Sequence, residues 1–139
     1  MLNFIEKLRT DGFRITKIRR LILDLLSQNQ KPIPSSKIQS YLSKNKASAH
    51  RTTIYRELLF LKEQKIIREL RLGENKRHYE LMPENDHHHI ICVNCEKIED
   101  IELSKHLRVE ERMITKNKKF KILMHSLEFY GLCGDCNIN

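Results

Sequence analysis

The chain has 139 residues, of which 40% are hydrophobic and 6% aromatic, enough for one domain or for two small domains with modest cores. No stretch approaches the roughly 18 apolar residues of a membrane span, and charged residues interrupt the N-terminal segment, so we expect a cytoplasmic protein without a signal peptide. The net charge of +8 comes from residues 1–80, which hold 18 Lys and Arg against 8 Asp and Glu, whereas residues 81–139 hold 8 against 10. This basic half favours nucleic acid over a membrane as a partner, with a merely solvated basic surface as the simpler alternative.

Residues 2–50 predict three helices, each with apolar residues at helical spacing. The first ends at the turn Asp11-Gly12, and Thr16 is expected to cap the second. The apolar stripe of the second helix consists of Ile18, Leu21, Ile22, Leu25 and Leu26. Two prolines then break the chain before a short helix capped by Ser35 or Ser36.

A longer helix over residues 51–64 has two different faces. Its core face is formed by Ile54, Leu58 and Leu61. Its opposite face presents the hydroxyls and guanidinium of Thr52, Tyr55 and Arg56. Residues 66–72 and 77–81 then predict a β-hairpin with its turn at 73–76. This order of helices and hairpin predicts a winged helix-turn-helix over residues 1–82.

Residues 83–139 predict a small α/β domain, which makes the whole chain α+β. Strands are expected over residues 90–93, 98–101, 120–123 and 126–130. A helix capped by Ser104 and carrying Leu107 and Ile114 is expected between the second and third of these strands.

The spacing of the four cysteines indicates a metal site. Cys92 and Cys95 form one pair separated by two residues, and Cys133 and Cys136 form the other. Four thiolates close a tetrahedral zinc site, and the 37 residues between the pairs indicate a folded unit between two knuckles. A domain this small needs such a staple, so we expect structural zinc, with an iron–sulfur cluster or a redox dithiol as alternatives.

The run His87-His88-His89 is a second candidate for metal binding, although three histidines in a loop are also ordinary polar surface. In an extended strand His87 and His89 point to one side and His88 to the other. Glu80 and Asp100 are placed to add carboxylates to His87 and His89, and this donor set suits first-row divalent metals.

The other side of the histidine run suggests a third, weaker site. It combines His88 with Asp86 and His125, and His106 or Glu110 could join them. The remaining histidines, His50 and His78, are interpreted as surface or DNA-facing residues.

Enzymatic functions lack their motifs. The sequence contains no His-Glu-x-x-His helix, no Gly-rich phosphate loop and no deaminase signature. A four-thiolate site also leaves no open coordination position for a catalytic water. We therefore expect a protein that is not an enzyme.

Taken together, these motifs resemble the ferric uptake regulator family, which includes zinc and manganese regulators and peroxide sensors. The resemblance covers nearly the whole chain and is carried by residues 11–16 with Arg19, 53–56, 79–81, 87–95 and 125–133. It implies a winged-helix DNA-binding domain, an α/β dimerisation domain, and a regulatory metal that closes a homodimer onto a palindromic operator.

The resemblance also implies roles for single residues. The residue matching Tyr55 contacts thymine, the one matching Arg56 reaches bases or phosphate, and the one matching Arg14 approaches the minor groove. The four cysteines match the structural zinc site of the family. The regulatory site of the family matches Glu80, His87, His89 and Asp100.

The sequence departs from the family pattern at several positions. Pro32-Ile33-Pro34 stands where a regulatory histidine is usual, so this site lacks that ligand. Asp86 and His88 are in swapped order, and Leu107 replaces a helix glutamate. Asp100 in place of a glutamate resembles the peroxide-sensing branch.

We therefore expect a homodimeric repressor of metal-uptake or peroxide-stress genes that holds structural zinc and responds to iron, manganese or zinc. Its contacts to double-stranded DNA are expected from Arg14, Arg19, Arg51, Thr52, Tyr55 and Arg56. Peroxide-sensing, haem-sensing and metal-independent members of the family are alternatives. A metal- or redox-handling protein that does not bind DNA is the alternative from another class, and the basic charge of residues 1–80 argues against it.

Overall fold

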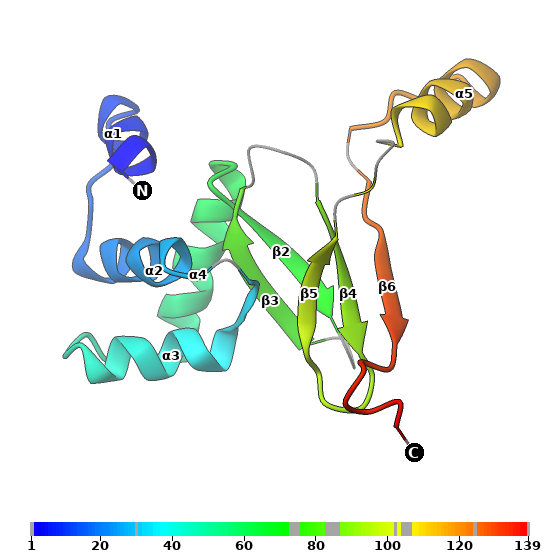
Figure 1. Cartoon of the computed structure of the whole chain (residues 1–139). Helices are drawn as coiled ribbons and strands as arrows, with labels where there is room; N and C mark the ends of the chain where they lie inside the picture. Colours follow the sequence, from blue (N-terminus) through cyan, green and yellow to red (C-terminus); the bar gives the residue numbers. More distant parts are fainter. Residues whose placement is uncertain are drawn as a thin grey trace. The chain divides into compact units, whose positions relative to one another are not determined.

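The computed structural model describes residues 2–29, 31–72, 76–82, 87–101, 103, 107–123 and 125–138. The chain divides into two compact units, Met1–Met82 and Pro83–Asn139. Each unit contains a three-stranded sheet, and the fold is α+β as predicted (Figure 1). None of the helices in the described ranges combines the length and apolar character that a membrane span requires.

The first unit packs four helices with an antiparallel sheet of strand order β1-β3-β2. Its elements are α1 (Leu2–Thr10), α2 (Lys17–Ser27), β1 (Ile33–Pro34), α3 (Ser35–Lys44), α4 (Arg51–Glu63), β2 (Ile67–Leu72) and β3 (Lys76–Leu81). The β2–β3 hairpin is the predicted wing. Helix α2 contacts α3, α4 and β3, so the helices and the hairpin share one core.

Local signals explain the beginnings of these helices. Gly12 has a φ of +83°, which a residue with a side chain rarely adopts, and it allows the tight turn after α1. The Thr16 hydroxyl accepts a hydrogen bond of 3.1 Å from the Arg19 backbone N–H and caps α2 as predicted. Helix α3 corrects the prediction of a serine cap, because Pro34 occupies the cap position and no side chain caps the helix there.

The core of the first unit is aliphatic and draws on every helix. Leu8, Ile22, Ile38 and Leu58 come from α1 to α4 in turn and are at most 2% exposed. Ile67 of β2 is also fully buried against this cluster. Burial of this apolar area stabilises the unit through the hydrophobic effect.

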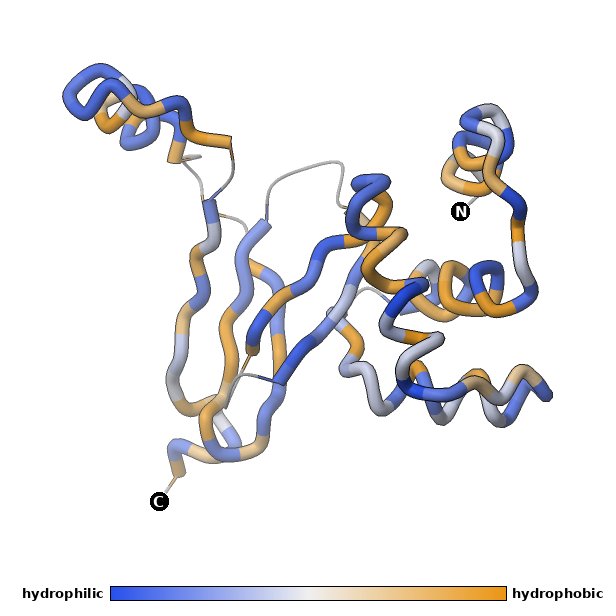
Figure 2. Tube along the Cα trace, turned by 180° about the vertical axis from the view of Figure 1, so that it is seen from behind, coloured by the Kyte–Doolittle hydropathy of each residue, from blue (hydrophilic) through white to orange (hydrophobic). Residues whose placement is uncertain are grey.

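The second unit has a sheet of strand order β5-β4-β6 and one helix. Its elements are β4 (His88–Cys92), β5 (Ile98–Ile101), α5 (Arg108–Lys118) and β6 (Glu128–Gly131). The central strand β4 runs antiparallel to β5 and parallel to β6. Helix α5 contains no buried residue, and hydrophobic and hydrophilic residues alternate around it (Figure 2).

Two segments differ from the sequence prediction. Residues 120–123 were expected to form a strand, but the part of the chain that the structure describes forms none there. Lys119 ends α5 with a φ of 55°, and Phe120 and Leu123 after it face solvent, with exposures of 71% and 82%. Conversely, the short β1 was not predicted, because it exists only through the pairing of Ile33 with Tyr79 of β3.

Candidate metal centres and nucleic-acid interface

The sheet of the second unit brings the two cysteine pairs together. Cys92 is the last residue of β4, and Cys133 comes two residues after the end of β6. Because these strands are parallel neighbours, their carboxyl ends lie at the same edge of the sheet, where Cys92 pairs with Gly131. Residues far apart in the sequence therefore meet at one point.

The four thiols have the arrangement of a tetrahedral metal site. All four Sγ atoms lie within 4.8 Å of one another, and Cys95 Sγ is 3.7 Å from Cys133 Sγ. A tetrahedron with zinc–sulfur bonds of about 2.3 Å places its sulfur atoms about 3.8 Å apart. The thiols are free of disulfides, so the donor set fits zinc as its structural ion.

The four thiols differ in how readily they lose a proton. Backbone N–H groups of Cys133 and Cys95 lower the pKa of Cys92 to about 6. In Cys136 the Asn94 side chain acts in the same direction, but hydrogen bonding to Cys133 and burial outweigh it and raise the pKa to about 12. Crowded thiolates repel one another, and a divalent cation is what allows all four to ionise together.

His89 of β4 has two neighbours from the predicted regulatory site, namely His87, which directly precedes the strand, and Asp100 of β5. His89 is 2% exposed, and its Nε2 lies 3.5 Å from Asp100 Oδ1 on the neighbouring strand β5. The His87 and His89 ring centroids are 4.9 Å apart. Imidazoles and a carboxylate suit first-row divalent metals, and His89 lies beside two other residues predicted for this site, His87 and Asp100.

The fourth predicted ligand of this site, Glu80, belongs to β3 of the first unit. It is 4% exposed and forms an ion pair with Arg68 of β2, directly across the hairpin. A carboxylate has two oxygens, so a pairing with arginine leaves acceptor capacity for a second cationic partner.

The opposite face of β4 carries His88 with His125, as the alternation along the strand predicted. His88 is 6% exposed, and its ring centroid is 5.5 Å from that of His125. His125 Nδ1 lies 2.7 Å from the Glu111 Oε1 atom on α5. Imidazole and carboxylate are donors that suit a divalent metal, and His125 contacts one of each.

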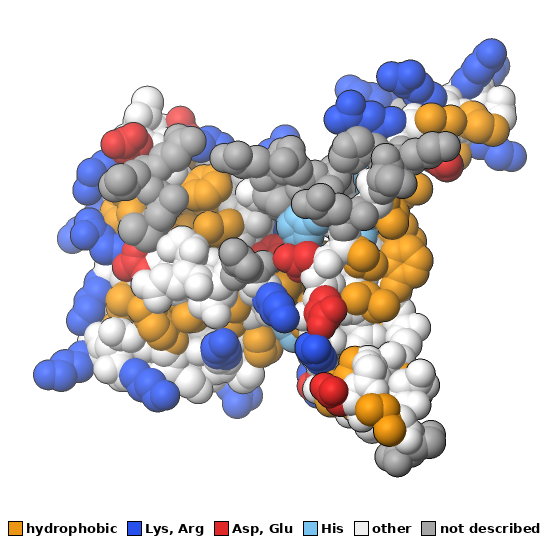
Figure 3. All heavy atoms as spheres, viewed as in Figure 1, with side chains coloured by type: hydrophobic (Ala, Val, Ile, Leu, Met, Phe, Trp, Pro, Cys, Tyr) orange, Lys and Arg blue, Asp and Glu red, His pale blue; other side chains and the backbone are white. Residues whose placement is uncertain are grey.

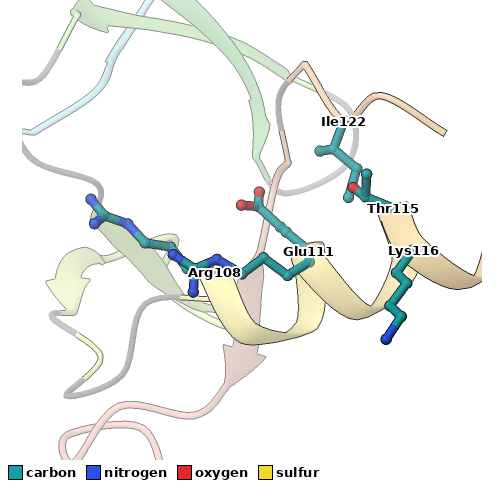
Figure 4. A pocket seen from close by; sticks show the side chains of 6 residues that line it. Arg108, Glu111, Thr115, Lys116 and Ile122 are labelled. Carbon is teal, nitrogen blue, oxygen red and sulfur yellow. The ribbon is translucent and has the colours of Figure 1, made fainter. Parts of the chain in front are cut away.

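Glu111 was missed by the sequence analysis, which named Glu110 and His106 instead. Figure 4 shows the Glu111 carboxylate projecting from α5 on a different side from Lys116. The sequence feature that could have identified Glu111 is its spacing. Glu111 comes one helical turn after Leu107, so both residues lie on the same side of a helix. Asp86 and His106 lie outside the described residues.

In the first unit, α4 exposes a polar and basic face. Ile54, Leu58 and Leu61 are buried in the core, as their spacing predicted. The residues predicted to face DNA from this helix are all exposed: Arg51, Thr52, Tyr55 and Arg56. A helix with such a face is suited to contact base edges and phosphates in a major groove.

A model of the ferric uptake regulator family matches residues 10–130 of the chain. The chain belongs to this family. It is 31% identical to the "Ferric uptake regulation protein" of Bacillus subtilis, over 95% of this chain and 91% of that protein. It is 33% identical to the "Peroxide-responsive repressor PerR" of Staphylococcus saprophyticus, over 95% of this chain and 88% of that protein. The ferric uptake regulator of Francisella tularensis with iron has a similar structure, with a TM-score of 0.76 and 28% identity over 91% of this chain and 96% of that one.

Within this family member, the structure does not support the predicted role of Arg19 in DNA binding. Arg19 is 8% exposed, and its Nε donates a 3.0 Å hydrogen bond to Glu57 Oε2 of α4. Its guanidinium carbon also lies 3.9 Å from the Phe60 ring centroid, and its Nη1 bonds the Arg14 carbonyl oxygen. The guanidinium therefore joins α2 to α4, whereas the Arg14 side chain is exposed.

Two departures from the family pattern have structural counterparts. The segment that replaces the usual histidine forms β1, in which Ile33 is 2% exposed and packs into the core. Leu107 lies at the cap position of α5, and Glu111 supplies the carboxylate that bonds His125. The chain thus keeps a helix glutamate beside His125, at a position one turn later.

Proposed function

We propose that this chain is a metal-responsive repressor that binds palindromic operator DNA as a homodimer and controls genes of metal uptake or peroxide defence. The four cysteines hold structural zinc. The regulatory metal is iron, manganese or zinc at His87, His89 and Asp100 with Glu80, and a third site combines His88 and His125 with Glu111.

The observation that carries the proposal is the strand β4. Its alternating side chains supply His89 to one donor set and His88 to another, and it ends at Cys92 of the four-thiol site. Three sets of candidate metal ligands meet at this short strand, and the other unit exposes the basic face of α4. This combination supports a regulator that couples metal to DNA.

A second copy of the chain is the partner that the second unit requires. Its exposed apolar side chains include Val109, Met113 and Ile114 of α5 and Phe129 and Tyr130 of β6. Figure 3 shows hydrophobic side chains gathered beside the Lys and Arg side chains of α5. An isologous interface between two copies would bury this apolar surface.

The deciding experiment measures the affinity of zinc-loaded protein for the DNA upstream of its own gene, at fixed salt, with and without manganese. We expect at least a tenfold tightening, which corresponds to about 1.4 kcal/mol of coupling. His89→Ala should abolish the tightening, and His78→Ala, on the wing, should retain it. Equal affinity with and without manganese, iron and zinc would exclude a metal corepressor.

Peroxide sensing is a second candidate, because the carboxylate beside His89 is an aspartate, Asp100. An aspartate in place of a glutamate at this position resembles the peroxide-sensing branch of the family. In that case the iron-loaded protein treated with peroxide would gain one oxygen atom on His87 or His89 and lose DNA affinity. Mass spectrometry of the peptide containing β4 checks this directly. An unmodified peptide with unchanged DNA binding would rule peroxide sensing out.

A further inference from the structure

Arg77 of the wing lies against Tyr55, an exposed residue of α4. The Arg77 guanidinium carbon is 5.5 Å from the centroid of the Tyr55 ring on α4. This is a cation–π geometry, in which the positive group faces the electron-rich ring. Arg77 is not among the residues that were predicted from the sequence to contact DNA.

A carboxylate on the neighbouring strand anchors Arg77. Arg77 Nε lies 3.6 Å from Glu69 Oε1 of β2, and Glu69 Oε2 accepts a 3.1 Å hydrogen bond from Lys62 Nζ of α4. The Glu69 side chain is only 14% exposed. Glu69 therefore connects the wing to α4, the helix that carries Tyr55, and it holds the Arg77 guanidinium near that helix.

The electrostatics of the group agree with this geometry. Hydrogen bonding with Tyr55 raises the pKa of Arg77, followed by the charge of Glu69 and the contact with Tyr79. Tyr55 and Arg77 also line a hollow of about 400 Å³ together with Arg51, Ser35 and Ser36. The tyrosine ring thus has a defined neighbour on the wing while 47% of its surface remains exposed.

We propose that Arg77 is a positioning residue that holds the Tyr55 ring in one orientation and thereby sets the sequence preference of the DNA-binding unit. An exposed tyrosine on a helix otherwise samples several rotamers, and a contact to a base edge requires one of them. The inference rests on the proposed DNA-binding function. It assigns Arg77 to sequence discrimination through Tyr55, not to a phosphate contact of its own.

Arg71 provides a matched control. It lies directly opposite Arg77 in the antiparallel register of β2 and β3, so both side chains project from the same face of the wing. Arg71 is exposed and carries the same charge. Replacing either arginine by alanine removes one positive charge from this face, but only Arg77 has a ring contact with Tyr55.

The experiment compares Arg77→Ala, Arg71→Ala, Tyr55→Ala and the double variant Arg77→Ala/Tyr55→Ala, all zinc-loaded, on an operator and on a scrambled duplex at fixed salt. Arg77→Ala should weaken operator binding about tenfold and binding to the scrambled duplex less than about twofold. In the Tyr55→Ala background it should cost nothing further on the operator. Arg71→Ala should weaken both duplexes alike.

Other outcomes overturn the inference. Equal losses on both duplexes, or losses that add to those of Tyr55→Ala, would make Arg77 a phosphate contact. NMR of ring-labelled tyrosine in the DNA-free protein gives a readout independent of DNA, in which Arg77→Ala should shift and average the Tyr55 ring signals. Unchanged ring signals in Arg77→Ala would reject the positioning role, whatever the DNA titrations show. Failure of the parent protein to distinguish operator DNA from the scrambled duplex would instead refute the proposed function.

Discussion

The two units of the chain are held together in different ways. In the first unit a contiguous aliphatic cluster is buried, with Leu8, Ile22 and Leu61 among its fully enclosed members. In the described part of the second unit, the buried residues are Ile91, Cys92, His88 and His89. The first unit has an ordinary hydrophobic core, whereas three of these four buried residues of the second unit are candidate metal ligands.

This difference predicts where metal sensitivity resides. We expect a unit of under 60 residues with so few buried apolar side chains to depend on a bound ion and on a partner surface for its stability. In the proposed function the same histidines and cysteines serve both folding and metal binding. In the first unit, by contrast, the exposed face of α4 is separate from the core face, so we expect its exposed residues to tolerate replacement without loss of fold.

Loss of zinc should produce the largest difference between the units. Cys95→Ser, or removal of zinc by a chelator, should leave the second unit without fixed structure, because structural zinc sites contribute on the order of 10 kcal/mol. The first unit should keep its exchange protection. Amide hydrogen exchange followed by mass spectrometry measures both units in one sample.

The control for this experiment is Asn137→Ala, which alters the same knuckle but keeps all four thiols. It should retain zinc and parental protection. If Cys95→Ser had the melting temperature and the amide hydrogen exchange of the parent, the four-thiol site would not be a structural zinc site.

A core truncation should produce the reverse pattern. Leu61→Ala removes a fully buried side chain of α4 and should lower the unfolding free energy of the first unit by roughly 2–5 kcal/mol. Zinc content should stay at the parental level. Denaturant unfolding combined with zinc analysis checks this, with the exposed Glu63→Ala as a control that should cost less than about 0.5 kcal/mol. Zinc loss in Leu61→Ala would show that the two units do not respond separately.

A smaller effect separates two arginines of the first unit. Arg19→Ala leaves the Glu57 carboxylate, which is 19% exposed, without its partner and should cost about 2 kcal/mol, less than for a fully buried pair. Arg14→Ala should leave thermal melting unchanged and weaken DNA binding. Melting curves and DNA titrations of both variants test the assignment, and equal stability of the two would return Arg19 to the DNA interface.

Elements with a strong periodic signal could be predicted from the sequence. Helix α4 was expected over residues 51–64 and spans Arg51–Glu63, and β5 has the bounds that were expected. The predicted strand over 120–123 failed because alternation predicts a strand only where a partner strand accepts it. The two-residue β1 shows the opposite case, in which the partner strand creates a strand that has almost no local signal.

The candidate sites were predictable where chemistry depends on residue type and close spacing. The cysteine pairs and the two faces of the histidine run follow from such spacing. The roles of Arg19 and Glu111 could not be predicted in this way. An arginine in an ion pair and an arginine facing DNA look alike in sequence, and the glutamate beside His125 occurs one helical turn later than expected. Only the tertiary partner of each side chain distinguishes these cases.

The smallest expected effect concerns alkaline pH and the core of the first unit. Burial raises the pKa of Tyr79 above its ordinary value of 10.0, and the charge of Glu69 acts in the same direction. A raised pKa means that this contribution to stability is fully present below about pH 10 and is lost as the pH rises through the value in the folded state. Denaturant unfolding between about pH 9 and pH 11 should therefore show stability that falls with pH, and Tyr79→Phe should flatten that slope. An equal slope in parent and Tyr79→Phe would place the alkaline sensitivity outside this core, and a loss of zinc over the same range would assign it to the second unit.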